Sequence, residues 1–255
     1  MQGIFDSHAH YDDERFEEDL EQVLQFIQDN GVTNIINVGC NIERSRECIA
    51  LAKKYQFIYA AVGVHPHDSA EVDDGYIDEI DKMLHEDKVV ALGEIGLDYH
   101  YDFSPRDVQK RVFEEQLQLA KAKDVPVIIH SREAVQDTME LLNQYQPKGV
   151  VHCFTGSAET AKECLKLGLY IGFTGVVTFP NARKTLEVIA ATPLERILLE
   201  TDCPYMAPVP FRGKRTTSDM IEKTADVIAS IKNVSTQELI DIARVNTIRL
   251  FLQPE

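Results

Sequence analysis

Six residues that can bind a metal ion lie at or just past the ends of short apolar segments. They are His8, His10, Glu94, His130, His152 and Asp202. Mixed imidazole and carboxylate groups suit Zn²⁺, Mn²⁺, Fe²⁺ or Co²⁺, and Mg²⁺ less well. Two such ions held about 3.5–4 Å apart activate a water for hydrolysis. The six residues therefore predict a two-metal hydrolase centre.

The first metal would be held by His8, His10 and Asp202. His8 and His10 are two positions apart, so both side chains point to the same side of a strand. Asp202 follows a later apolar segment. It is also the candidate for taking the proton from the attacking water, because metal ligation keeps a carboxylate ionised near neutral pH.

The second metal would be held by His130 and His152, with Glu94 bridging the two ions. A carboxylate offers two oxygens, whereas a neutral imidazole usually serves one metal. We therefore count Glu94 with Asp202 as catalytic. Each residue alone is weakly informative, since a histidine at the end of a strand often has only a structural role. Their combination at the ends of five segments carries the prediction.

Eight β-rich segments and the longer amphipathic stretches between them would have to position these side chains. Val127-Ile128-Ile129, for example, is apolar throughout, which is typical of a parallel strand buried on both faces. We predict strands at residues 3–8, 34–38, 58–62, 89–93, 127–130, 150–153, 170–173 and 196–200.

The stretches between these segments have helical patterns, as at residues 14–30 and 105–123. In the second stretch, Ser104 is placed as the N-cap and Pro105 in the first turn. The final helix would start at Ser235, where Glu238 completes a capping box.

Alternating strands and helices allow a closed barrel or an open doubly wound sheet. The sequence has no GxGxxG or GxxxxGK[ST] phosphate loop, which the open sheet usually carries. Functional residues at the ends of many different strands are typical of the barrel. We predict one α/β domain over residues 1–255, a (β/α)8 TIM barrel with its active site at the C-terminal ends of the strands.

Composition narrows the choice of partners and location. The net charge of −16 repels polyanions, so a broad duplex-binding surface is not expected. The N-terminus lacks a signal-peptide pattern, and no apolar run is long enough for a membrane span. Five scattered cysteines suggest free thiols in a reducing compartment. We expect a cytoplasmic protein with no membrane contact, and we infer no obligate protein partner.

Several motifs resemble those of the TatD family of metal-dependent deoxyribonucleases, within the amidohydrolase superfamily. The resemblance runs from residue 3 to about residue 252. It implies a TIM barrel with two divalent metals that hydrolyses phosphodiesters, typically in DNA, and it supports the same six ligands. The motifs are FDSHAH (5–10), GVHP (63–66), GEIGLDY (93–99), HSR (130–132), HCFTG (152–156), ETDCPY (200–205), RGKR (212–215) and NTIRLF (246–251).

One segment departs from the family pattern. The family usually follows Arg-Gly-Lys-Arg with Asn-Glu-Pro, but this chain has Thr216-Thr217-Ser218. We expect this loop to shape the mouth near the substrate, so the departure bears on substrate preference more than on the metal chemistry.

Three residues are candidates for binding substrate. Arg132 follows His130 closely and is placed to contact a phosphate. His65 follows the third strand and either donates to a phosphate or is a loop histidine fixed by Pro66. Arg212 belongs to a compact basic cluster that either contacts a nucleic acid backbone or is a solvated loop.

The leading hypothesis is a metal-dependent deoxyribonuclease that acts on a DNA end or a single strand, by exonucleolytic cleavage. The first alternative keeps the centre but hydrolyses small phosphoesters, amides or aminoacyl esters. The second alternative is a non-catalytic metal-binding barrel. Hydrolysis of single-stranded DNA, of small esters, or of neither would separate the three.

Overall fold

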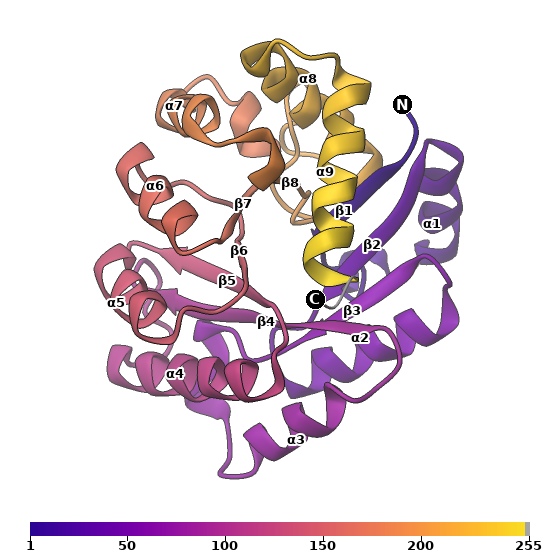
Figure 1. The fold of residues 1–255 in the computed structure, drawn as a ribbon. Coiled ribbons are helices and arrows are strands. Elements are labelled where there is room, and N and C mark those ends of the chain that lie inside the picture. Colours follow the sequence, from indigo (N-terminus) through magenta and orange to yellow (C-terminus); the bar gives the residue numbers. More distant parts are fainter. Residues whose placement is uncertain (253–255) are drawn as a thin grey trace.

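The computed structural model describes residues 1–252, which contain one sheet of eight parallel strands in chain order. Figure 1 shows the strands as a ring with helices around it. The predicted TIM-barrel fold is confirmed. The strands are β1 (Ile4–Ala9), β2 (Val32–Val38), β3 (Ile58–Val62), β4 (Val89–Asp98), β5 (Val127–Arg132), β6 (Gly149–Val151), β7 (Tyr170–Phe173) and β8 (Ile197–Leu199).

The ring closes through the segment that follows β8. Ala9 forms a parallel bridge with Cys203. The main-chain N–H of Asp202 donates to the carbonyl of His8 at 2.9 Å, and the N–H of His10 donates to the carbonyl of Cys203 at 2.9 Å. The bonds that close the barrel thus bring the end of β1 and the segment after β8 together at the predicted first metal group.

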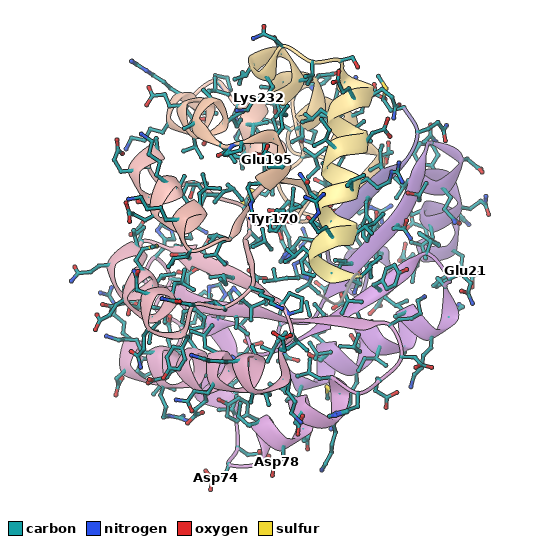
Figure 2. All side chains as sticks on the ribbon, in the orientation of Figure 1. Glu21, Asp74, Asp78, Tyr170, Glu195 and Lys232 are labelled. Carbon is teal, nitrogen blue, oxygen red and sulfur yellow. The ribbon has the colours of Figure 1, made fainter. Side chains whose placement is uncertain are left out.

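Each strand is buried on both faces. In β5, Ile128 packs with residues from the other strands inside the barrel, whereas Val127 and Ile129 pack with the layer of helices. Figure 2 labels Tyr170 near the middle of the ring and Glu21 at its periphery. This two-sided burial explains the continuous apolar segments of the sequence.

Helices alternate with the strands around the ring. Within residues 1–252, none of them combines the length and apolar character needed to cross a bilayer. The α-helices are α1 (Leu20–Asp29), α2 (Ile42–Lys54), α3 (Tyr76–Met83), α4 (Arg106–Lys123), α5 (Val135–Tyr145), α6 (Ala158–Lys166), α7 (Arg183–Ala191), α8 (Ile221–Lys232) and α9 (Thr236–Phe251). Short 3₁₀ helices are η1 (Glu14–Phe16), η2 (Pro66–Glu71), η3 (Gly175–Thr178), η4 (Leu194–Arg196) and η5 (Ser218–Met220).

The last helix, α9, covers the N-terminal end of the barrel (Figure 1). Phe251 packs with side chains of the barrel interior. Asn246 donates to the carbonyls of Leu194 and Ile197, just before and at the start of β8. The opposite end of the barrel, where the strands finish, is left for the site.

Some predicted boundaries were wrong. β4 continues past Gly93 to Asp98 because residues 95–98 pair with residues 129–132 of β5. β6 ends at Val151, so His152 lies just beyond the strand. The predicted helix at residues 14–30 is divided into η1 and α1.

The predicted caps had different outcomes. Ser235 caps α9 as predicted, since its hydroxyl accepts a hydrogen bond from the N–H of Glu238. Ser104 does not cap α4, and Pro105 precedes the helix rather than lying in its first turn. The Ser104 hydroxyl instead donates to the carbonyl of His67 at 2.8 Å, which joins the loops after β3 and β4.

Candidate metal centre

The C-terminal end of the barrel brings all six predicted metal-binding residues together. A cavity of about 720 Å³ opens there. Its lining includes five of the six, and His8 lies fully buried beside His10. Residues from β1, β4, β5 and the segments after β6 and β8 therefore converge at one site, as the strand-end pattern predicted.

His8, His10 and Asp202 form the first group. His8 Nε2 lies 3.1 Å from His10 Nε2. Asp202 Oδ1 lies 3.3 Å from His10 Nε2 and 3.7 Å from His8 Nε2. Ligand atoms about 2.0–2.1 Å from a tetrahedral metal are roughly 3.3 Å apart. The three side chains are thus spaced as ligands of a single ion would be.

Glu94 lies between the first group and a second. Its Oε2 is 3.5 Å from His8 Nε2. Its Oε1 is 2.8 Å from His152 Nε2 and 2.9 Å from His130 Nδ1. The two oxygens of one carboxylate therefore face different histidines, which is the geometry that a bridging ligand needs.

The close approach of β4 to β5 beside Glu94 depends on a glycine. Gly96 has φ of +147°, and a Cβ at this position would collide with the main-chain carbonyl of His130. A residue with a side chain would therefore be strained here and would push the strands apart. Gly96 lets Glu94 and His130 meet.

Acceptors lie near the outward-facing ring nitrogens of His10, His130 and His152, and those of His10 and His130 are within hydrogen-bond distance. His10 Nδ1 is 2.8 Å from the carbonyl oxygen of the last residue of β2. His130 Nε2 is 3.1 Å from Asp98 Oδ2, and His152 Nδ1 is 3.5 Å from Glu200 Oε1. An acceptor on one ring nitrogen leaves the lone pair of the other directed at a metal. The donor set present in the structure thus fits a metal ion.

His65 also lies beside Glu94, but its ring is turned as a donor. His65 Nδ1 accepts a hydrogen bond from the main-chain N–H of His67 at 3.1 Å. Burial lowers the pKa of His65 well below its ordinary value, so the ring is neutral and its single proton is on Nε2. That nitrogen is 3.7 Å from Glu94 Oε1. His65 therefore presents an N–H to the centre rather than a lone pair.

The two carboxylates of the centre are ionised. Burial alone would raise the pKa of Glu94, but the charge of His152 and the hydrogen bond from His130 help to hold it well below its ordinary value. Burial likewise acts to raise the pKa of Asp202, but the hydrogen bond from His10 and the charge of His152 together help to hold it below its ordinary value. Ionised carboxylates are the form that binds metal cations.

A family model described as TatD related DNase matches residues 5–252. The chain belongs to the TatD related DNase family. The family predicted from the motifs is confirmed, and so is the predicted class, a metal-dependent hydrolase.

Relatives of known name or structure align over most of the chain. The "uncharacterized metal-dependent hydrolase YabD" of Bacillus subtilis is 42% identical over 97% of this chain and 98% of its own. The "3'-5' ssDNA/RNA exonuclease TatD" of Pectobacterium carotovorum is 37% identical over 83% of each chain. The crystal structure of YjjV, a TatD homologue from Escherichia coli, has a TM-score of 0.92 and 36% identity over 98% of both chains.

The two predicted arginine contacts of this TatD-family chain lie in different places. Arg132 lines the cavity, with its guanidinium 4.8 Å from the ring centre of Tyr101. Arg212 is exposed and lies 4.2 Å over the ring of Phe179, outside the residues that line the cavity. The structure thus brings Arg132, but not Arg212, to the candidate centre.

The Thr216-Thr217-Ser218 segment does not line the mouth, contrary to our expectation. Thr216 and Ser218 are buried, and Ser218 Oγ donates to Asp6 Oδ2 at 2.6 Å. The preceding Arg215 pairs with Asp19 Oδ2 at 2.6 Å. These contacts tie the loop to β1 and to the start of α1, so its side chains hold the barrel together beneath the site.

Glu200 is a residue of the site to which our sequence analysis gave no role. It is fully buried and accepts a hydrogen bond from the main-chain N–H of Cys153. Gly172 of β7 leaves room for it, because a Cβ at that position would press against the Glu200 carboxyl group. An acidic residue at the end of an apolar segment was the available sign, the same one that indicated Glu94.

Proposed function

We propose that this TatD-family hydrolase uses two divalent metal ions to cleave phosphodiester bonds of DNA, at a strand end or in a single strand. The observation that carries the proposal is the position of Glu94, whose Oε2 faces His8 while its Oε1 faces His130 and His152. When bound, two metals at such a centre lower the pKa of a water and polarise the bond to be cut.

The geometry of the centre suggests which residues would bind each metal. His8, His10 and Asp202 would hold one metal, His130 and His152 the other, and Glu94 both. We assign Asp202 the role of taking the proton from the attacking water. Its side chain is ionised, lines the cavity and is 14% exposed, so that a water within the cavity can reach it.

The substrate side of the cavity has donors for a phosphate. His65 presents its Nε2–H, and Arg132 presents a guanidinium for which no ion pair with a carboxylate occurs within residues 1–252. The net charge of −16 disfavours long duplexes, whereas a single strand or an end can enter the cavity. The name of the Pectobacterium relative, an ssDNA/RNA exonuclease, supports the same substrate class.

The five free cysteines support a cytoplasmic location, where thiols remain reduced. We also propose that residues 1–255 act as one hydrolase domain, since the family model extends from residue 5 to residue 252.

The test compares wild type with Glu94→Ala, using metal analysis and degradation of end-labelled single-stranded DNA. Glu21→Ala is the matched control, because Glu21 is an exposed glutamate at the periphery (Figure 2). We expect wild type and the control to bind two metal equivalents and to degrade the DNA. Glu94→Ala should lose metal and more than about a hundredfold of the activity.

Two results would contradict the proposal in different ways. If metal-loaded wild type left DNA intact while hydrolysing small phosphoesters or aminoacyl esters, the proposed substrate would be wrong. If the Glu94→Ala protein kept two metals and full activity, the proposed metal centre bridged by Glu94 would be wrong.

A further inference from the structure

Two aromatic side chains stand exposed at the rim of the cavity. Phe103 is 66% exposed and Tyr101 is 47% exposed, and both belong to the cavity lining. Their ring centres are 5.2 Å apart and their planes differ by 18°, so the rings are stacked. Apolar rings left in water forgo the free energy that burial would supply. A stacked, exposed pair beside a reactive site therefore marks a surface for a ligand.

The ring pair is held in place before any ligand arrives. The edge of the His67 ring packs against both, with ring centres 4.8 Å from Phe103 and 5.4 Å from Tyr101. His67 Nε2 is in turn 3.0 Å from Asp98 Oδ2. Ser104, next to Phe103, is bonded to the carbonyl of His67. A surface that is already ordered loses little entropy when it binds.

The ring of His67 lies between the aromatic pair and the candidate centre. The ring centre of His67 is 6.3 Å from that of His130, whose Nδ1 contacts Glu94. Arg132 lies over Tyr101 and lines the same cavity. A phosphate held at the centre would thus have a cation and a stacked ring pair beside it, which are the two features that bind single-stranded nucleic acid.

We propose that Phe103, supported by Tyr101, is a platform on which an unpaired nucleobase next to the cleaved phosphate stacks. The proposal rests on the proposed function and specifies its substrate as single-stranded nucleic acid. Every base has a π-face, so the platform would tolerate any sequence. A base inside a duplex has both faces covered by its neighbours, whereas a base in a single strand can leave its stack.

The first test compares wild type, Phe103→Ala and Phe26→Ala on two single-stranded oligonucleotides, one complete and one with an abasic site next to the cleaved bond. Phe26 is the matched control, because it is 54% exposed on α1 and outside the cavity lining. In Phe103→Ala, the ratio of kcat/KM for the complete to the abasic strand should fall about tenfold through KM. The control should keep the wild-type ratio.

The second test measures binding without cleavage. A single strand with 2-aminopurine at the same position and a phosphorothioate linkage that resists cleavage at the neighbouring bond is mixed with metal-loaded protein, with and without the Phe103→Ala change. Stacking should quench the fluorescence when Phe103 is present, and the Phe103→Ala change should abolish the quenching. The conservative change Phe103→Tyr should retain it, because a tyrosine ring can also stack on a base.

The outcomes separate the platform from the proposed function. Cleavage of DNA with an unchanged ratio in Phe103→Ala would overturn the platform and leave the function standing. If wild type cleaves no nucleic acid, the function fails and the binding test decides alone. Equal quenching with and without Phe103, or no binding at all, would overturn the platform.

Discussion

The Ser218 hydroxyl donates a hydrogen bond to Asp6 Oδ2 at 2.6 Å, which ties the loop after β8 to the first strand. The buried Asp6 carboxylate also accepts from the N–H of His8 at 3.2 Å and from the N–H and hydroxyl of Thr201 at 3.0 and 2.5 Å. His8 is a predicted ligand, and Thr201 precedes the predicted ligand Asp202. One carboxylate therefore orders the main chain that carries both.

Removal of the Asp6 carboxylate should destabilise the protein strongly. Asp6→Ala would leave two main-chain N–H groups and two hydroxyls without their buried acceptor. We expect the free energy of unfolding to fall by about 3 kcal/mol. Ser218→Ala removes two hydrogen bonds of its hydroxyl, one to Asp6 and one with the Tyr11 hydroxyl, so its cost should be about 2 kcal/mol. Urea denaturation followed by circular dichroism would measure both values.

The control for this comparison is Asp74→Ala. Asp74 is an exposed aspartate at the edge of the molecule (Figure 2), and its loss should change the stability by less than about 0.5 kcal/mol. If Asp6→Ala unfolded at the same urea concentration as this control, the carboxylate would have no organising role.

Much of the fold and of the candidate site followed from local patterns. His8 and His10 are two positions apart at the end of β1, and Glu94 follows an apolar run, so the barrel topology places all three at the same end of the barrel. Strands such as β5 are buried on both faces and therefore need apolar residues at successive positions. This continuous apolar pattern allowed the strands to be predicted from the sequence.

The features that sequence patterns did not predict depend on contacts between distant segments. Ser218 appeared to be a mouth residue until its bond to Asp6 placed it beneath the site. The continuation of β4 to Asp98 follows from its pairing with β5, not from its own composition. The orientation of the His65 ring is set by a hydrogen bond from the main-chain N–H of His67. Every residue except proline has such an N–H, so the residue types do not predict this bond.

Metal binding should release protons from the centre. Burial acts to lower the pKa of His10, but Cys40 and Asp202 hold it well above its ordinary value, so the metal-free ring is protonated near neutral pH. Its Nδ1–H is bonded to Val38, so the proton displaced by a metal is the one on Nε2. Metal affinity should therefore fall as the pH is lowered.

Calorimetric titration with Zn²⁺ or Mn²⁺ in two buffers of different ionisation enthalpy would count the released protons. His10→Ala should bind less metal and release fewer protons. A binding enthalpy that is the same in both buffers, with an affinity that does not change from pH 8 to pH 6, would contradict the prediction.

His65 should affect turnover without affecting metal content. Because its Nδ1 accepts the N–H of His67, its Nε2–H points toward Glu94 and the cavity, where it can stabilise charge on a phosphate. We expect His65→Ala to keep both metals and to lose about a hundredfold in kcat/KM. His65→Gln should recover part of the activity, since an amide N–H can take the place of the Nε2–H. If His65→Ala instead lost a metal equivalent, its ring would be a ligand and the assignment of its proton would be wrong.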